Sequence, residues 1–149
     1  MYADRRGKLH QLPRNITPKE STSVYGILVQ NNKLLVVKCK WSSLWEFPGG
    51  TREIGESNEE ALTREFFEET GLRIAPGRLV AKQHALFYAD DLNQYFNKTL
   101  LFFIVSTDEH TPSPGEEITS VHWLRKSPSK NVHPLHSQVI NNLFKTPLA

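Results

Sequence analysis

The chain has 149 residues, a length that suits one domain with a single hydrophobic core. Its formal net charge of +2 is too small to indicate nucleic-acid binding by itself. No apolar run approaches the roughly 20 residues of a membrane helix, and the N-terminus lacks a signal-peptide core. Cys39 is the single cysteine, which excludes an internal disulfide and a thiolate metal cluster. We therefore expect a soluble, cytoplasmic protein, with Cys39 as a structural strand residue.

The N-terminal third predicts an arm followed by a β-hairpin. Residues 1–20 are polar with few apolar anchors, so we expect a poorly ordered arm ahead of a domain at 21–149. Residues 22–30 and 33–40 are β-branched, apolar runs, as in strands. Asn31-Asn32 between them predicts the hairpin turn.

A glycine-rich loop comes next. Residues 41–47 predict an approach to a short strand ending at Phe47, and Pro48 then breaks any regular element. Gly49-Gly50 permits backbone shapes and close approaches that a Cβ would forbid. A carbonyl of this loop is a candidate metal ligand, and its amides are candidates to face a phosphate.

A helix is predicted between Ser57 and Gly71. Ser57 is a candidate N-cap, and Glu60 three residues later completes a capping box. Gly71 is the residue type expected just past a helix C-terminus. Leu62 and Phe66 form an apolar i, i+4 pair that gives the helix a face to bury.

Three carboxylates share one face of this helix, because Glu65, Glu68 and Glu69 stand at i, i+3 and i+4. At ~4 Å and an effective dielectric near 20, each like-charge pair costs roughly 4 kcal/mol. A hard divalent ion such as Mg²⁺ or Mn²⁺ removes that repulsion. The alternative is a solvated acidic face, but negative charge in a last helical turn is unfavourable to the helix dipole. The pattern therefore indicates a metal site.

The C-terminal half predicts further strands and one more helix. In chain order we expect a turn at Pro76-Gly77, a strand at 79–88, a turn at 89–93, a buried strand at 99–106, a loop at 111–117, a strand at 118–124 and an amphipathic helix at 135–144. His133-x-x-His136 has the spacing of a metal pair but lacks a third ligand, so we expect solvent-facing histidines.

The residues of the loop and helix together form a longer motif. Read from the loop, it is Gly50-x5-Glu56-x7-Arg64-Glu65-Phe66-x-Glu68-Glu69-x-Gly71-Leu72. This motif resembles the Nudix box, the signature of the Nudix (MutT-like) hydrolases. The one departure is Phe66, where the family usually has Ile, Leu or Val, which concerns core packing rather than chemistry. The resemblance implies an α+β fold, a Nudix-type α/β/α sandwich with a central mixed β-sheet.

The resemblance also implies an activity. Nudix enzymes are Mg²⁺-dependent (or Mn²⁺-dependent) hydrolases that cleave a diphosphate linkage in a nucleotide or a nucleoside-diphosphate-linked substrate. One alternative is a non-catalytic nucleotide-sensing domain, against which the intact charged box argues. Another is an RNA 5′-end pyrophosphohydrolase, for which the near-neutral charge offers little support. The expected partner is a small nucleotide, with no membrane or nucleic acid, and a homodimer stays open.

Carried over residue by residue, the resemblance implies a set of metal ligands. Glu65 and Glu69 are direct ligands, and Glu68 is a third one. The Gly49 carbonyl is a candidate backbone ligand, and Glu56 supports the loop or an outer metal. Glu68 and Glu69 are also catalytic candidates.

Other roles are less closely defined. Arg64 is implied to orient the carboxylates. Glu117, on the 111–117 loop, is a candidate general base, and Glu116 beside it is an alternative. Both glutamates could equally be solvated loop carboxylates without a catalytic role. The general base in relatives can also be a glutamate of the box itself.

The substrate-binding candidates are four residues outside the acidic cluster. Gly50 and Arg52 stand at the glycine loop, where they could meet a phosphate. Lys38 lies on a strand that could line the pocket. Tyr88 follows the box by sixteen residues, near where some dinucleoside-polyphosphate Nudix enzymes carry a tyrosine. A surface or core-packing role explains each of these side chains as well.

Overall fold

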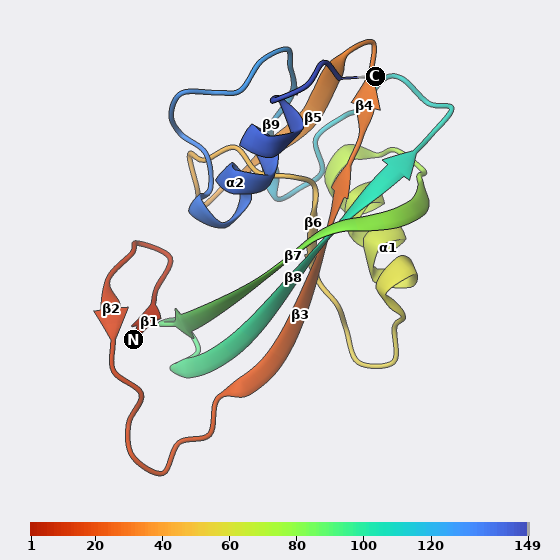
Figure 1. Ribbon diagram of the computed structural model, residues 1–149. Coiled ribbons are helices and arrows are strands. Elements are labelled where there is room, and N and C mark those ends of the chain that lie inside the picture. Colours follow the sequence, from red (N-terminus) through yellow and green to blue (C-terminus); the bar gives the residue numbers. More distant parts are fainter. Residues whose placement is uncertain (149) are drawn as a thin grey trace.

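The computed structural model describes residues 1–148, and over that range it contains nine strands and two helices (Figure 1). In chain order these are β1 (Tyr2–Ala3), β2 (Leu9–His10), β3 (Lys19–Ile27), β4 (Val29–Gln30), β5 (Lys33–Cys39), β6 (Gly49–Thr51), α1 (Asn58–Thr70), β7 (Ala75–Ala89), β8 (Gln94–Ser106), β9 (Ile118–Leu124) and α2 (Pro134–Leu143).

The strands form two sheets. The larger sheet has the order β2-β1-β7-β8-β3-β6, and the smaller one has the order β4-β5-β9. β3 and β8 are parallel, whereas β7 and β8 are antiparallel, so the larger sheet is mixed. α1 and α2 pack on its opposite faces (Figure 1). The predicted α/β/α sandwich with a central mixed sheet is confirmed.

The two faces of β8 enter two different cores. Leu101 and Phe103 pack with α1, while Leu100 and Phe102 pack with α2, as the two-residue period of a strand requires. β8 therefore lies between helices on both sides. This position explains the continuous apolar run that predicted a buried strand at 99–106.

Both ends of α1 form as the sequence predicts. The Ser57 hydroxyl accepts the Glu60 N–H at 3.0 Å, and the Glu60 carboxylate accepts the Ser57 N–H at 3.0 Å. At the other end Gly71 has φ +72°, and its N–H donates to the Phe67 carbonyl at 2.8 Å. These caps fix the helix register, and with it the direction of each glutamate side chain.

Phe66, the aromatic residue that departs from the usual box, packs against Gly26 of β3. Phe66 is fully buried in the core under α1. A Cβ added to Gly26 would lie 2.6 Å from two ring carbons of Phe66, closer than real carbon contacts. The missing side chain at Gly26 therefore makes the space that the Phe66 ring fills.

Two local predictions are wrong. Pro76-Gly77 is part of β7 rather than a turn, with register shifts between Pro76 and Leu79. Proline is tolerated at a bulge, and at this end of β7 its other edge is unpaired in the described chain. Residues 41–47 form only single bridges, at Trp45 and Glu46. The strand forms instead at β6, which pairs with β3.

The N-terminal segment joins the larger sheet where β1 runs parallel to the end of β7, with Ala3 opposite Phe87 (Figure 1). Asp4 is buried there and accepts hydrogen bonds from His10 Nε2 at 2.9 Å and from the backbone N–H groups of Arg6 and Lys8 at 2.9 and 3.0 Å. These contacts hold the β1–β2 hairpin closed.

We predict that Gly26→Ala and Phe66→Leu are energetically coupled. Gly26→Ala alone should lower the free energy of unfolding by about 1–3 kcal/mol, because its methyl group overlaps the Phe66 ring. In the Phe66→Leu background the cost should be smaller, since leucine lacks those ring carbons. Urea unfolding of the four variants measures this coupling. Equal costs of Gly26→Ala in both backgrounds would contradict the account.

A second prediction concerns pH and the Asp4 side chain. The hydrogen bond from His10, together with the two backbone N–H groups, lowers the pKa of Asp4 to about 2. Because the folded-state pKa lies below the unfolded one, Asp4 stabilises the fold fully above about pH 4–5, and this contribution is lost as the pH falls through about 2. The difference in unfolding free energy between wild type and Asp4→Asn should therefore shrink on acidification, as urea unfolding can measure. A constant difference would contradict this assignment.

Candidate functional site

The acidic face of α1 packs against the glycine loop. The Gly49 N–H donates to Glu69 Oε1 at 2.9 Å. A Cβ on Gly50 would lie 2.6 Å from the Glu65 carboxyl carbon. A Cβ on Gly49 would collide with the backbone of Val24 and Tyr25 on β3. Gly49 is therefore required for β6 to lie against β3, whereas a side chain at Gly50 would displace the Glu65 carboxylate.

Arg64 is the cation at the centre of the acidic cluster. Its Nε and Nη2 donate to the two oxygens of Glu56 at 2.7 and 2.8 Å, a bidentate pair. Its Nη1 donates to Glu65 at 3.0 Å and, more weakly, to Glu68 at 3.5 Å. The Arg64 guanidinium, with a backbone N–H from Glu53, lowers the pKa of Glu56 to about 2. Glu56 is therefore a charged anchor for Arg64.

The folded protein disfavours the ionised forms of Glu65 and Glu69. Burial, followed by the nearby charges of Glu46, Glu65 and Glu117, raises the pKa of Glu69 to about 9, against the opposing Gly49 N–H. Burial also raises the pKa of Glu65, with Arg64 opposing. Both carboxylates therefore lack sufficient positive charge around them. Glu68 is different, since 56% of its side chain is exposed.

The loop at 111–117 caps the C-terminus of α1. The N–H groups of Ser113 and Gly115 donate to the carbonyls of Thr70 and Glu69 at 2.8 and 3.1 Å. The loop backbone comes so close that a Cβ on Gly115 would overlap the Glu68 carbonyl. This docking brings Glu117 near enough for its charge to raise the pKa of Glu65 and Glu69. Glu116 and Glu117 are both exposed.

Glu46 also belongs to the site, although no sequence motif predicted it. Burial raises the pKa of this carboxyl, and its charge adds to that of the cluster around Glu69. The Cys39 thiol donates to Glu46 Oε1 at 3.1 Å, and Cys39 is buried, as its strand position predicts. The available signal was a glutamate between two aromatic residues, Trp45 and Phe47, directly before the glycine loop.

The substrate-binding candidates occupy different places. Gly50 is at the carboxylates, and Arg52 stands beside it, exposed, with Nη1 donating to Asn58 at 2.6 Å. Lys38 Nζ lies 4.2 Å from the ring centroid of Trp45. Gly50 and Arg52 therefore lie in and just after β6, and Lys38 lies against Trp45, which precedes the loop.

Tyr88 is not brought to the carboxylates. Its hydroxyl donates to Asn93 at 2.9 Å, and its ring lies tilted against His10, with ring centroids 4.3 Å apart, at the end of β7 next to the N-terminal hairpin. Tyr88 pairs with Tyr95, beside the start of β3, whereas Gly49 pairs with Tyr25. About six residues of β3, or roughly 20 Å, separate the two positions.

The expectation of solvent-facing histidines is wrong. His136 is buried, and its Nδ1 accepts the Phe47 N–H at 3.0 Å. His133 is the N-cap of α2, and its Nδ1 accepts the Leu135 N–H at 3.1 Å. Burial lowers the pKa of both rings, so they are neutral at pH 7. These nitrogens serve the fold rather than a metal.

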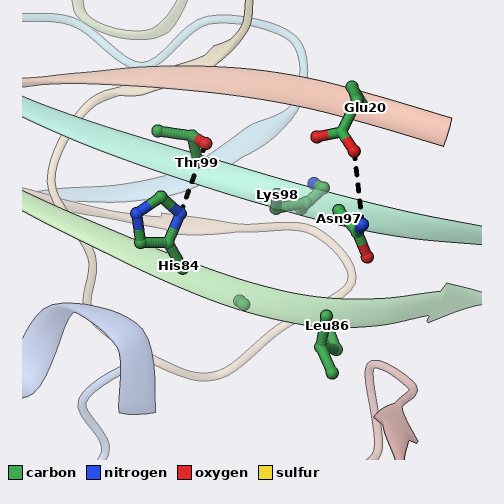
Figure 2. A pocket seen from close by; sticks show the side chains of 7 residues that line it. Glu20, His84, Leu86, Asn97, Lys98 and Thr99 are labelled. Carbon is green, nitrogen blue, oxygen red and sulfur yellow. Dashed lines mark hydrogen bonds between the residues drawn. The ribbon is translucent and has the colours of Figure 1, made fainter. Parts of the chain in front are cut away.

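A separate shallow pocket lies along β3, β8 and β7 (Figure 2). His84 faces Thr99 at 3.5 Å, and Asn97 donates to Glu20 at 3.2 Å. None of the box carboxylates lines this pocket.

A divalent cation fits the donor set around Glu65 and Glu69. Within residues 1–148 no three acidic, imidazole or thiol side chains form a ready-made cluster for a metal ion. The donors present are nevertheless oxygens, which Mg²⁺ and Mn²⁺ prefer. The Glu65 carboxylate lies against the Gly50 backbone, where a Cβ would displace it, and both carboxylates are short of positive charge.

Sequence comparison finds relatives of the same kind. A "MutT-like protein" of Streptomyces ambofaciens is 31% identical over 113 residues, which is 72% of this chain and 65% of that one. An "8-oxo-dGTP diphosphatase" of Buchnera aphidicola is 30% identical over 60% of this chain and 65% of its own. An "ADP-ribose pyrophosphatase" of Methanocaldococcus jannaschii is 44% identical over 35% of this chain and 32% of its own. This chain thus spans less than two thirds of the curated relatives that it matches.

Structural comparison agrees with the fold. The crystal structure of a MutT protein from Methanosarcina mazei superposes with a TM-score of 0.70 at 18% identity, covering 88% of this chain and 96% of that one. No helix of the described chain is both long and apolar enough to cross a membrane. The family model of the NUDIX domain matches residues 19–142. With the glycine loop and the carboxylate helix arranged as described, the chain belongs to the NUDIX family.

Proposed function

We propose that this protein is a divalent-cation-dependent hydrolase that cleaves a diphosphate linkage in a nucleotide or a nucleoside-diphosphate-linked compound. The observation that carries the proposal is the buried Glu69 carboxylate, held by the Gly49 N–H beside Glu65. Such a pair of carboxylates gains stability from a bound cation, and a cation there would attract a polyphosphate. The names of the relatives, which include 8-oxo-dGTP and ADP-ribose enzymes, support the same class of substrate.

Glu65 and Glu69 would hold the cation, with Glu68 and the Gly49 carbonyl as further ligands and Glu56 as support for the loop. When bound, Mg²⁺ or Mn²⁺ neutralises phosphate oxygens and lowers the pKa of a coordinated water.

The remaining roles follow from position and charge. Arg64 holds the Glu56 and Glu65 carboxylates in fixed orientations. Glu117 is the candidate proton acceptor, because its loop places a solvent-accessible carboxylate beside the buried pair. Glu68 and Glu69 are the alternatives for that role.

Arg52 and Lys38 are the cations that would meet phosphate oxygens near the Gly50 amide. Arg52 contacts Asn58 at the start of α1, and Lys38 contacts Trp45 ahead of the loop. Tyr88 lies apart from these groups and supports the proposal least.

We predict that Glu69→Gln lowers turnover at least tenfold without loss of stability. The amide keeps the shape of the side chain and cannot ionise, and the folded protein disfavours the ionised form at this position, so the free energy of unfolding should stay equal or rise. Glu59→Gln, an exposed change in the first turn of the same helix, is the matched control and should keep wild-type turnover. Wild-type turnover by Glu69→Gln would contradict the assignment.

The substrate is best found with a panel. Nucleoside triphosphates and their oxidised forms, nucleotide sugars, dinucleoside polyphosphates and a 5′-triphosphorylated RNA should be assayed with Mg²⁺ and with Mn²⁺. We expect release of phosphate, pyrophosphate or a nucleoside monophosphate from a free nucleotide. Tight nucleotide binding with no product would instead indicate a sensing domain, and faster cleavage of the RNA would indicate an RNA-end hydrolase.

A further inference from the structure

β9 is a long edge strand with little protection against pairing with another chain. It is the outer strand of the smaller sheet and pairs with β5 alone. Its seven residues include no lysine, arginine, aspartate, glutamate, proline or glycine. Natural sheets use short strands, charges, prolines or bulges to keep a second chain from adding to an edge. In β9 the single such feature is a register shift opposite Lys38 and Cys39.

The other sheet edges of the described chain are better protected. The edge strands β2, β4 and β6 have only two, two and three residues. β7 is open along part of its outer side, but that part contains Pro76, two register shifts and the charged side chains of Arg78 and Lys82. A strand from another chain would therefore add to β9.

The hydrogen bonds of β5 show which of its backbone groups point away from β9. The Leu35 N–H donates to the Leu28 carbonyl at 3.0 Å, on the side of β4. The Val37 N–H donates to the Glu46 carbonyl at 2.9 Å, and the Val37 carbonyl accepts the Glu46 N–H at 3.0 Å. Backbone groups alternate in direction along a strand, so the even-numbered residues of β5 point toward β9.

The same alternation defines the free edge of β9. Val36 on β5 lies opposite His122, so the two residues exchange hydrogen bonds across the ladder. The neighbours of His122, Val121 and Trp123, therefore point their N–H and C=O groups outward. Within residues 1–148 no other strand lies on that side to accept or donate to them.

The charges that flank β9 are complementary to one another in the antiparallel sense. Glu117 stands four residues before Val121 and Arg125 stands four residues after it, while Glu116 and Lys126 stand five residues before and after. All four charged side chains are exposed, and none belongs to an ion pair within residues 1–148. An antiparallel copy centred on Val121 would place each glutamate beside a basic side chain, and such cross-strand pairs are stabilising.

The uncharged residues match in the same register. Ile118 would lie opposite Leu124 of the partner subunit, and Ser120 opposite His122 of the partner subunit. At the centre Val121 would lie opposite the partner's Val121, with the outward N–H and C=O groups of both residues bonded to each other. Apolar, polar and charged positions thus each meet a suitable partner in one alignment.

We propose that β9 pairs antiparallel with β9 of a second copy of this chain, in a two-fold symmetric dimer centred on Val121. The same patch then serves both subunits, as a two-fold interface requires. Arg125 of the partner subunit lies beside Glu117, whose charge acts on Glu65 and Glu69. The partner therefore adds a cation at the rim of the acidic site. The dimer does not depend on the proposed activity, and its tests require no substrate.

The first test is the mass in solution, by light scattering after size exclusion. Wild type should have twice the 17.1 kDa mass of one chain. Arg125→Glu/Lys126→Glu makes both flanks of β9 acidic, and Glu116→Lys/Glu117→Lys makes both basic. Each double variant alone should dimerise at least about tenfold more weakly, because like charges then face each other. A mixture of the two should form a 1:1 heterodimer.

The matched control is Lys130→Glu, the same charge change at an exposed lysine of the loop after β9, which should stay dimeric. A monomeric wild type would overturn the inference. Either double variant that dimerises as tightly as wild type, or a mixture that forms no heterodimer, would overturn it as well, since the contact would then lie elsewhere.

Disulfide formation tests the register. Val121→Cys should link the two subunits under mild oxidation, because the Cα atoms of such a central pair are about 5.5 Å apart. His122→Cys is the control: it is more exposed than Val121, but it would lie two residues from the partner's His122 and should stay unlinked. Wild type sets the baseline, since its Cys39 is buried. Equal linking of both variants, or no linking of Val121→Cys, would overturn the pairing.

Discussion

The packing of a buried carboxylate against a backbone amide determines the arrangement of this site. Glu69 accepts the Gly49 N–H at the junction of α1 and β6, and a side chain at Gly49 would collide with β3. Removing the charge from water there disfavours the ionised form, and one N–H donor offsets only part of that cost. The protein thus keeps an acidic group in a position where folding alone gains little from its charge. Such a conflict between stability and local chemistry is typical of functional sites.

The charges around this junction fall into two groups. Arg64 makes its shortest hydrogen bonds to Glu56, whose pKa is low, so that pair is satisfied within the protein. Glu65 and Glu69 stay short of positive charge, and Glu46 adds a further carboxyl. Arg64 and Glu56 position the loop and the helix. Glu65, Glu69 and Glu46 form the acidic group that a bound cation would stabilise. A single guanidinium cannot satisfy both groups.

Local signals in the sequence were sufficient for the elements that hold the site. The capping box at Ser57, the C′ glycine Gly71 and the Asn31-Asn32 turn each act within a few residues, and all three form as predicted. Features that depend on partners distant in sequence could not be predicted. His136 is buried because it accepts the Phe47 N–H. The ring of Phe66 fits because Gly26 has no side chain. Glu117 reaches the site because its loop docks against α1. Pro76-Gly77 predicted a turn, but the segment instead pairs with β8 as part of β7.

Binding of a cation at Glu65 and Glu69 can be measured without any substrate. A ligand that binds the folded state alone raises the free energy of unfolding by about 2.7 kcal/mol at a hundred times its dissociation constant. Urea unfolding of the wild-type protein should therefore shift to higher denaturant with millimolar Mg²⁺ or Mn²⁺ relative to EDTA. The Glu65→Gln/Glu69→Gln double variant should be more stable than wild type in EDTA and should not respond to the metal. If wild-type unfolding is the same in EDTA and in millimolar metal, Glu65 and Glu69 do not bind a cation.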